Sequence, residues 1–348
     1  MYELTSADRN APPYDGPALS VTDVRAVVRD GWYNAFADLV VWRDYYWLSY
    51  RRGTKHHADH GMVVVLRSSD LQRWQEVAVL DRPQGISGVI DSGVQDGHFC
   101  VAGDRLCITI NTRVPTEEYL SWTDDGINWS EPLLQTMEGF EPFIWRMTYH
   151  DDRFWCATSG PESDPLYLIV SDDGIIWTEH ARIAGTNVHD WSGETDLLFR
   201  PDGELWCVVR SEWPGVFFRS RPPYTEWEGG HSIGLCDAPS ICEADGEVFV
   251  AGRLRVPLFE GDLRLHPQGT TGVYHLRRGG ARPLLAFPVG GDSAYSGLIT
   301  TGPGKLAIAY FSDVAYWSGV LPPKSADRYQ YKVTDCDIYV AEIDIVNG

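Results

Sequence analysis

Short stretches of this chain alternate between hydrophobic and polar residues, and sharp turns separate the stretches. In the stretch GETDLLFRPDGELWCVVRSE (193–212), two alternating runs flank the pair Asp202-Gly203. Alternation with a period of two is typical of β-strands with one buried face, and an Asp-Gly pair between two such runs predicts a hairpin. Five other stretches have the same form, with turns at Asp44, Asp104, Asp152, Gly246 and Gly304. The pattern therefore predicts six β-hairpins.

These hairpins recur at intervals of about 50 residues, and several are followed by a second hairpin that ends in a tryptophan. The tryptophans concerned are Trp74, Trp129, Trp177 and Trp227. A repeat of about 50 residues with four strands per unit is typical of a β-propeller, in which each small sheet buries both faces against its neighbours. We predict an all-β fold, a six-bladed β-propeller that forms one domain over residues 1–348. The stretch LSVTDVRAVVRDG (19–31) is one strand more than six blades need, and we expect it to close the last blade beside DIYVAEIDI (337–345).

Two of the second hairpins, SWTDDGINW and VSDDGIIW, approximate the Asp-box pattern S/T-x-D-x-G-x-x-W, with Trp122 and Val170 at its first position. In such a turn the aspartate side chain accepts backbone N–H groups, the glycine takes a positive φ, and the tryptophan packs against the blade wall. The alternative is calcium binding by the paired aspartates. We favour the structural turn, because these loops lie at the outer hairpin of each blade.

The chain carries 49 acidic residues against 29 lysines and arginines, which gives a formal net charge of −20. Nucleic acids and anionic membrane surfaces are therefore excluded as partners, because both require a basic surface. The seven cysteines lack CxxC spacing and most lie in apolar runs, so neither a zinc site nor a redox motif is predicted. The first residues show no signal-peptide pattern and no apolar run is long enough to cross a bilayer, so we expect a cytoplasmic protein.

In a propeller, the residues just before the first strand and just after the second strand of each blade meet on one face, opposite the first hairpin turns. Before the first strand they are Asn34, Asp91 or Asp96, Arg146, Glu194, Asp237 and Tyr295. After the second strand they are Arg51 or Arg52, Asn111 or Arg113, Ser159, Arg210, Arg253 and Asp313. Converging titratable groups in a concave mouth predict a site, although propeller mouths are commonly polar and Arg–Glu pairs often only tie adjacent strands together.

The Asp-turn motifs and the six units, together with four residues of the mouth, resemble the sialidase superfamily of glycoside hydrolases, and in particular its poorly characterised bacterial members. The four residues are Glu194, Arg210, Arg253 and Tyr295. The resemblance spans the whole chain in organisation. It implies that Tyr295 is the nucleophile, that Glu194 is its base, and that Asp59 in KHHADHG is the acid/base. It also implies that Arg210 and Arg253 hold an anion or hydroxyl groups of the substrate.

One position departs from the superfamily pattern. Sialidases begin their first blade with Arg-Ile-Pro, whereas this chain has Asn34-Ala35-Phe36. Asparagine cannot form the bidentate charged pair by which arginine holds a carboxylate, and Arg52 and Arg146 are the candidates to compensate. We therefore expect a glycoside hydrolase without a cofactor, acting on an oligosaccharide or other small glycoconjugate, with little or no activity on ordinary sialosides. The predicted substrate-binding residues are Arg210, Arg253, Arg52, Arg146, Asn34, Asp96 and Asp237.

Two other functions stay open. One is a non-hydrolytic carbohydrate-binding propeller, in which exposed aromatic rings bind sugar without turnover. The aromatic residues concerned are Trp32, Trp145 and Trp191. The other is a lyase or biosynthetic enzyme that uses the same mouth, since a tyrosine beside an arginine can abstract a proton next to a uronate carboxylate. We predict no metal at His56, His57 and His60, because no carboxylates with metal-ligand spacing accompany them.

Overall fold

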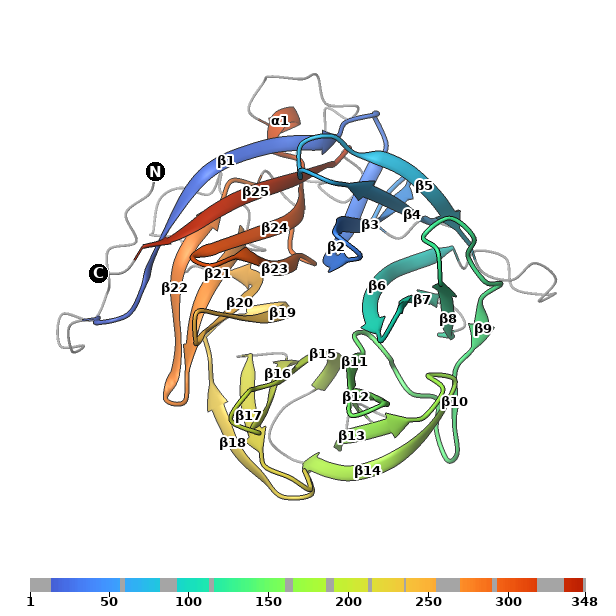
Figure 1. Ribbon diagram of the computed structural model, residues 1–348, viewed down its shortest axis with the longest axis vertical. Coiled ribbons are helices and arrows are strands. Elements are labelled where there is room, and N and C mark those ends of the chain that lie inside the picture. Colours follow the sequence, from blue (N-terminus) through green and yellow to red (C-terminus); the bar gives the residue numbers. More distant parts are fainter. Residues whose placement is uncertain are drawn as a thin grey trace.

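The computed structural model of the chain consists almost entirely of β-strands, arranged as six small sheets in a ring around a central axis (Figure 1). The structure describes residues 14–56, 60–81, 93–112, 116–159, 165–185, 191–211, 215–234, 236–254, 270–289, 293–317 and 335–346. Within these ranges, one short helix accompanies the strands, α1 (Val314–Trp317). The predicted all-β, six-bladed β-propeller is confirmed.

The strands of each blade follow one another from the axis outward, and neighbouring strands are antiparallel except for the added strand β10, which is parallel to β14. The first three blades contain β2 (Tyr33–Trp42), β3 (Tyr45–Gly53), β4 (Met62–Ser68) and β5 (Gln75–Leu80); β6 (Val94–Ala102), β7 (Arg105–Thr112), β8 (Glu118–Thr123) and β9 (Leu133–Leu134); and β11 (Thr148–His150), β12 (Arg153–Ser159), β13 (Leu166–Ser171), β14 (Ile176–Ala184) and β10 (Thr136–Met137). The last three contain β15 (Trp191–Phe199), β16 (Leu205–Ser211), β17 (Val216–Ser220) and β18 (Trp227–Ser232); β19 (Cys236–Ala244), β20 (Glu247–Leu254), β21 (Thr270–Arg277) and β22 (Gly280–Phe287); and β23 (Gly297–Gly302), β24 (Lys305–Ser312), β25 (Asp337–Val346) and β1 (Ala18–Val28).

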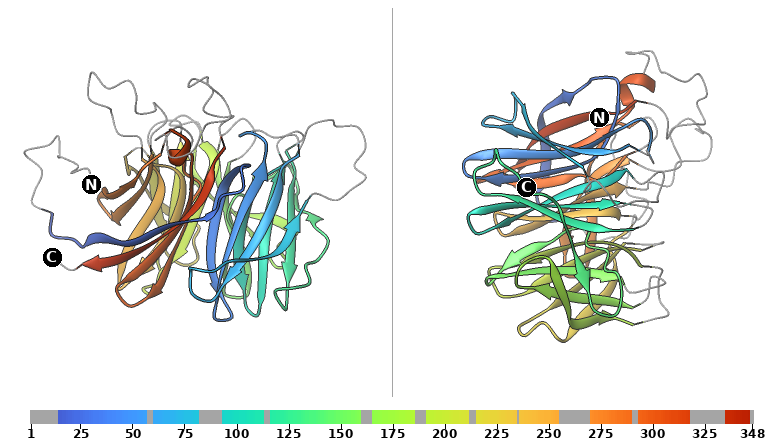
Figure 2. Two further views of the ribbon diagram at one scale, coloured as in Figure 1. Left: turned by 90° about the horizontal axis from the view of Figure 1, so that it is seen from above. Right: turned by 90° about the vertical axis from the view of Figure 1, so that its right-hand side faces the viewer.

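The N-terminal strand β1 forms the outer edge of the sixth blade. It runs antiparallel to β25, with Ala18 opposite Val346, and the two strands lie side by side in Figures 1 and 2. Just beyond β1, Arg29 Nε donates a hydrogen bond to Asp337 Oδ2 at 2.7 Å. The prediction that the first strand closes the last blade is confirmed, so hydrogen bonds between β1 and β25 join the beginning of the ring to its end.

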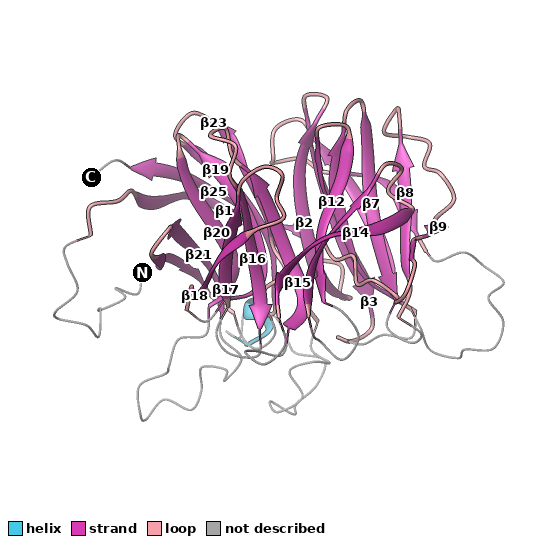
Figure 3. Ribbon diagram, turned by 90° about the horizontal axis from the view of Figure 1, so that it is seen from below, coloured by secondary structure: helices cyan, strands magenta, loops and turns pink. Residues whose placement is uncertain are grey.

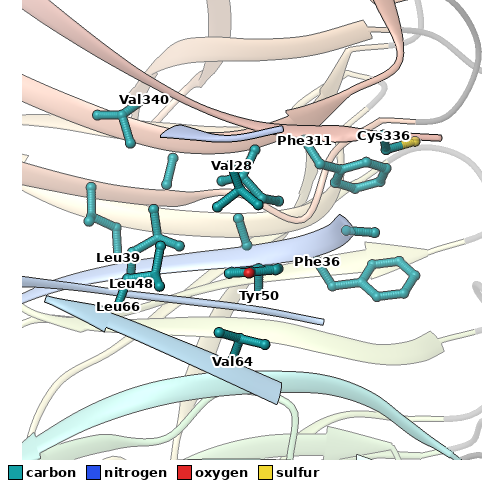
Figure 4. Packing of buried hydrophobic residues seen from close by; sticks show 14 of the residues in the cluster. Val28, Phe36, Leu39, Leu48, Tyr50, Val64, Leu66, Phe311, Cys336 and Val340 are labelled. Carbon is teal, nitrogen blue, oxygen red and sulfur yellow. The ribbon is translucent and has the colours of Figure 1, made fainter. Parts of the chain in front are cut away.

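Hydrophobic side chains fill the space between neighbouring blades. Between the first and sixth blades, one cluster contains Leu39, Leu48 and Val64 together with Phe311 and Val340 (Figure 4). All five are buried. Removing a side chain of this size from water stabilises the fold by about 1.5–3 kcal/mol. Because both faces of a blade are covered in this way, the middle strands are rich in hydrophobic residues.

Polar side chains also tie the inner strand of one blade to the next blade. Asp38 on β2 accepts the N–H of Phe99 at 2.8 Å, and Asp196 on β15 accepts the N–H of Ile241 at 2.8 Å. These N–H groups face a neighbouring blade, so the aspartates satisfy hydrogen bonds that the strand ladders leave open. The ring is therefore held by specific hydrogen bonds as well as by hydrophobic packing.

The second hairpin turns are closed by aspartate side chains. Asp173 Oδ1 accepts the N–H groups of Ile175 and Ile176 at 2.8 and 2.9 Å, and the adjoining Trp177 is fully buried. Asp125 Oδ1 accepts two N–H groups of its own turn at 2.8 and 2.7 Å. The aspartates therefore stabilise these turns by local hydrogen bonds, as predicted.

The seven cysteines are free thiols, and six of them are buried. Burial raises the pKa of Cys107 to about 12, so this thiol behaves as a small hydrophobic group. In the part of the chain that the structure describes, no helix combines the length and the hydrophobicity needed to cross a membrane.

Candidate active site

The predicted mouth is the face of the ring at which the first strands of the blades begin. Seen from the side, the strands of all blades run between two faces, and α1 lies at one of them (Figure 3). Because α1 directly follows β24, the second strand of the sixth blade, it marks the face where second strands end and first strands begin. Most of the predicted site residues lie at the ends of strands that meet this face.

A tyrosine from the sixth blade meets an ion pair from the fourth blade at this face. Glu194 lies on β15, Arg210 lies on the adjoining strand β16, and Tyr295 lies just before β23. Tyr295 Oη donates to Glu194 Oε1 at 2.6 Å, and Arg210 Nη1 donates to the same oxygen at 2.5 Å. The predicted hydrogen bond between tyrosine and glutamate is confirmed. Glu194 and Arg210 are therefore more than an isolated surface ion pair.

Burial keeps the tyrosine in its neutral form. It raises the pKa of Tyr295 well above the ordinary value of 10.0, and the negative charge of Glu194 raises it further. The charge of Glu194 also raises the pKa of Arg210. A neutral phenol that donates to a carboxylate is the starting arrangement for proton transfer from tyrosine to glutamate.

Arg253 and Asp237 form a second ion pair beside the first. They are partners across β20 and β19, and Arg253 Nη1 donates to Asp237 Oδ2 at 3.1 Å. Arg253 Nη2 donates to the carbonyl oxygen of Ser293 at 2.8 Å. On its other side, Asp237 Oδ1 lies 3.9 Å from Arg210 Nε. The two arginines predicted for the site are therefore close together, with an acid of the chain between them.

Arg146 crosses the centre of the ring. It precedes β11 in the third blade, and its Nη1 donates to Asp38 Oδ1 in the first blade at 2.7 Å. Its Nη2 donates to the carbonyl oxygen of Ser296, before the first strand of the sixth blade, at 2.9 Å. Burial alone would raise the pKa of Asp38, but the charges and hydrogen bonds of Arg146 and His98 together outweigh this effect and hold the pKa at about 2. The guanidinium of Arg146 is thus engaged by the chain on two sides.

Asn34 and Arg52 both contact Asp30. Asn34 Nδ2 donates to Asp30 Oδ1 at 2.7 Å, and Arg52 Nε lies 3.4 Å from the other oxygen of the same aspartate. Arg52 Nη2 also donates to Glu76 Oε2 at 3.1 Å. Successive residues of a strand point to opposite faces, and it is the preceding Arg51 that is fully buried. These polar contacts of Asn34 and Arg52 thus go to Asp30 and Glu76.

Two buried carboxyls lie on the second blade. Asp96 on β6 and Glu118 on β8 flank Asn111 on β7, in register across the three strands. Asn111 Nδ2 donates to Asp96 Oδ2 at 3.2 Å. Asp96 Oδ1 and both carboxyl oxygens of Glu118 are buried without a hydrogen-bond partner. Buried carboxyl oxygens of this kind can accept hydrogen bonds from a ligand that reaches them.

The surroundings of these carboxyls favour their protonated forms. Burial, and then the charge of Glu194, raises the pKa of Asp96 to about 7, against the lowering effect of its bond with Asn111. Burial and the charge of Asp96 raise the pKa of Glu118 as well. The position of Asp96 at the mouth was predictable from the sequence, whereas Glu118 was not among the predicted residues. The signal for Glu118 was its position at the beginning of a third strand, opposite Asn111.

The first strands of several blades are bent where the site residues lie. Register shifts occur at this end of β2, β15 and β19. Four residues other than glycine have a positive φ in this region, 59° at Phe36, 52° at Ala238, 84° at Ala294 and 48° at Tyr295. Such conformations cost about 1–3 kcal/mol each, and bulges near functional sites re-aim side chains. Positive φ values at the opposite face fall in hairpin turns, where they are expected, whereas those at the mouth lie beside or within strands and support a functional role for that end.

Phe36 gives the tyrosine an aromatic neighbour in the first blade. The ring centroids of Phe36 and Tyr295 are 4.7 Å apart, and the Arg51 guanidinium lies 4.8 Å from the centre of the Phe36 ring. Trp145 approaches Tyr295 from the third blade, with ring centroids 5.7 Å apart. Both Phe36 and Trp145 are buried. Phe36 was not among the predicted site residues. The bend in β2 that orients its ring leaves no mark in the pattern of hydrophobic and polar residues.

Several residues weighed in the sequence analysis lie outside the described residues. They are Asp59, His57, Asp91, Arg113 and the side chain of Trp191. His56 is described, and its Nδ1 lies 3.1 Å from Tyr33 Oη. Among the described residues, no three His, Cys, Asp or Glu side chains gather in a group that could hold a metal ion.

Comparisons with known proteins connect this architecture to sialidases. No protein-family pattern and no curated protein matches the sequence. Among solved structures, a protein of unknown function from Dyadobacter fermentans matches with a TM-score of 0.74 at 14% identity, covering 94% of this chain and 100% of the other. The phage phi92 endosialidase matches with a TM-score of 0.63 at 11% identity, covering 96% and 70%.

Trypanosoma rangeli sialidase in complex with sialic acid matches with a TM-score of 0.59 at 11% identity, covering 91% of this chain and 55% of that chain. The present chain thus spans about half the length of the Trypanosoma sialidase. At these identities the likeness concerns the fold. The protein has a sialidase-like β-propeller fold.

Proposed function

We propose that this protein is a glycoside hydrolase in which Tyr295 is the nucleophile and Glu194 is its base. The hydrogen bond of 2.6 Å between their oxygens carries the proposal, because it joins residues 101 positions apart across two blades. The strained backbone at Tyr295 and the convergence of charged groups around it support a role in chemistry. The sialidase-like fold supports the same assignment.

The proposed reaction has two displacements. In the first, the Tyr295 oxygen bonds to the anomeric carbon, its proton passes to Glu194, and the glycosidic bond breaks as an acid protonates the leaving oxygen. We assign the acid role to Asp59, on its position in the sequence. In the second, water attacks the same carbon and breaks its bond to tyrosine, Asp59 accepts the proton of the water, and Glu194 returns its proton to Tyr295. Two displacements retain the anomeric configuration.

Arg210 positions the base for this transfer. It donates to the same glutamate oxygen that accepts from the tyrosine, so the carboxylate is held between two donors. The guanidinium of Arg210 lies 2.5 Å from this oxygen, so the charged contact fixes the orientation of the carboxyl group toward Tyr295. Arg210 therefore acts through Glu194, and we describe it as a positioning residue.

We propose a carbohydrate or glycoconjugate other than an ordinary sialoside as the substrate. Asn34 stands where the resemblance implies the first arginine of a carboxylate clamp, and its side chain binds Asp30. Arg146, a candidate to replace that arginine, is held by Asp38 and by the carbonyl of Ser296. A clamp without this arginine lacks a charge-assisted hydrogen-bonded pair, which is worth about 1.5–3 kcal/mol.

Covalent labelling tests the proposed nucleophile. Activated 2-deoxy-2-fluoro glycosides of several common sugars slow the second displacement, so the glycosyl-enzyme should accumulate. We expect intact-mass measurement to detect the adduct and peptide mapping to place it on Tyr295. Tyr295→Phe should abolish both label and turnover. Tyr45→Phe, at an exposed position of β3, should preserve both.

Other outcomes would identify the alternatives. A label on a carboxylate would replace the nucleophile, and an ultraviolet-absorbing unsaturated product would identify a lyase. Saturable sugar binding without label or turnover would identify a carbohydrate-binding protein. One observation favours that last reading: Trp32, at the start of the first blade, is 46% exposed and its ring is accessible for stacking on a sugar. Trp145, considered for the same purpose, is fully buried.

A further inference from the structure

We propose that the sugar bound beside Tyr295 carries no carboxylate, because acids of the chain already pair with Arg210, Arg253 and Arg146. The inference rests on the proposed hydrolase and narrows its substrate to an uncharged, hydroxyl-rich sugar. The residue that carries it is Asp237, which lies between Arg210 and Arg253.

Asp237 occupies the position that an anion would need to bridge the two arginines. Its Oδ2 lies 3.1 Å from Arg253 Nη1, and its Oδ1 lies 3.9 Å from Arg210 Nε. The side chains of Asp237 and Arg253 are only 5% and 7% exposed, so the pair belongs to the interior of the site. Their pairing across β19 and β20, followed by the bend at Ala238, keeps this carboxylate where it is.

Three arginines around the centre of the ring each have a carboxylate of the chain in close contact. The pairs are Arg210 with Glu194 at 2.5 Å, Arg253 with Asp237 at 3.1 Å, and Arg146 with Asp38 at 2.7 Å. Because each of these arginines is already paired with a carboxylate, little net positive charge remains to attract a carboxylate of the ligand. A ligand carboxylate would have to displace an acid of the chain and leave that acid buried without its counter-ion, which is strongly unfavourable.

The other ionisable groups of the mouth also favour a hydroxyl-rich ligand. Asp96 Oδ1 and the Glu118 oxygens are buried without a hydrogen-bond partner, and carboxyl oxygens accept hydrogen bonds from sugar hydroxyls. When ionised, both would repel a ligand carboxylate. A fourth arginine, Arg51, lies near enough to Asp96 to lower its pKa, and it donates to the carbonyl oxygen of Lys55 at 2.7 Å.

A tyrosine nucleophile is compatible with an uncharged sugar. A phenol is advantageous where nearby negative charge would repel a nucleophilic carboxylate. In this protein Glu194 and Asp237 supply that charge within the site. The presence of Tyr295 therefore does not require a carboxylate on the substrate.

Matched probes test the charge preference directly. We would titrate the protein, by NMR, with methyl glucoside against methyl glucuronide, with methyl galactoside against methyl galacturonide, and with acetate. The wild-type protein should bind the neutral member of a pair at least about tenfold more tightly than the uronide. Asp237→Asn keeps the shape of the side chain and removes its charge, so it should bind acetate and uronides at least about tenfold more tightly than the wild type.

A matched control lies on the same strand. Glu243, at the opposite end of β19, pairs with Arg200 at 3.0 Å, and Glu243→Gln should change none of these affinities. Tighter binding of a uronide than of its neutral partner by the wild type would overturn the inference, and this result does not depend on any variant. An unchanged acetate affinity in folded Asp237→Asn protein would overturn it as well.

These outcomes separate the inference from the hydrolase proposal. A label on Tyr295 combined with preference for uronides would keep the hydrolase and remove the inference. Preference for neutral sugars without any label would keep the inference as a property of binding and remove the hydrolase.

Discussion

Asp96 is a carboxyl whose surroundings in the fold differ sharply from water. It is buried, one of its oxygens has no hydrogen-bond partner, and Glu194 adds negative charge nearby. Asn111, Arg51 and Arg146 lower its pKa, but burial outweighs them and the pKa is raised to about 7. Between its ordinary value of 3.8 and this raised value, the folded protein holds a proton on Asp96 that the unfolded chain releases. The group therefore makes the fold progressively less stable as the pH rises through this window.

Asp96→Asn should remove this pH-dependent penalty. The free energy of unfolding of the variant should rise relative to that of the wild type by about 3 kcal/mol between about pH 5 and about pH 8. Urea unfolding at several pH values in this range measures the difference. Parallel stability curves for the two proteins would show that Asp96 ionises in the fold as it does in the unfolded chain.

Asn34→Arg should not produce a working sialidase. The asparagine is fully buried and binds Asp30, so the longer side chain should destabilise the fold by about 1–3 kcal/mol. A fluorogenic sialoside assay, combined with urea unfolding, should show no turnover by the wild type or the variant. Robust wild-type turnover that Tyr295→Phe abolishes would show that other residues complete a carboxylate clamp.

At the scale of single elements, each blade combines regular hairpins with one irregular end. The outer turns follow local rules: the aspartate accepts neighbouring N–H groups, as Asp173 does, and a buried tryptophan follows. The mouth ends of β2, β15 and β19 depart from regular pairing. A bend there re-aims nearby side chains, and Glu194 and Asp237 of neighbouring blades both approach Arg210 at these ends.

Asp173→Ala should test the contribution of an outer turn. The substitution removes the acceptor of two backbone N–H groups and should lower the free energy of unfolding by about 1–2 kcal/mol. Its neighbour provides the control, because Asp172 is exposed and its ion pair with Arg153 lies at the surface, so Asp172→Ala should cost less than about 1 kcal/mol. Equal losses measured by urea unfolding would contradict the structural role of this turn.

At the scale of the whole molecule, the ring is closed without a covalent bond. β1 from the beginning of the chain pairs with β25 from its end, and the polar contacts of this junction centre on Asp337. The Asp337 carboxylate is fully buried and accepts from Arg29 Nε at 2.7 Å and from Tyr316 Oη at 2.9 Å. A site built from residues of several blades, including Phe36 of the first and Tyr295 of the sixth, needs this closure, because opening the ring would separate the first blade from the sixth.

Asp337→Ala should loosen the whole ring. It leaves a buried tyrosine hydroxyl and an arginine without their acceptor, which should cost about 3 kcal/mol. Glu342→Ala is the control on the same strand, because Glu342 pairs with Arg25 at the surface and its loss should cost less than about 1 kcal/mol. Similar unfolding midpoints for the two variants in urea would show that the closure does not depend on Asp337.

The blades and their closure were predictable because their determinants are local. Alternating residues, Asp-Gly turns and recurring tryptophans specify a strand or turn wherever they occur, and their interval near 50 residues sets the number of blades. The extra strand predicted at 19–31 was then expected to pair with the strand at 337–345, which ends the sixth blade. The contact between Tyr295 and Glu194 was also predicted, through the resemblance to sialidases, and the structure confirms the hydrogen bond.

The charge balance of the site was decided only by the tertiary structure. The sequence placed Arg210, Arg253 and Arg146 at the mouth, but it did not show that Asp237 lies between the first two or that Asp38 holds the third across the axis. These contacts depend on bends in the first strands and on distances across the ring. A shift of one residue in register turns a side chain to the other face of its sheet, so the partner of each arginine follows from how the blades pack and not from any local pattern.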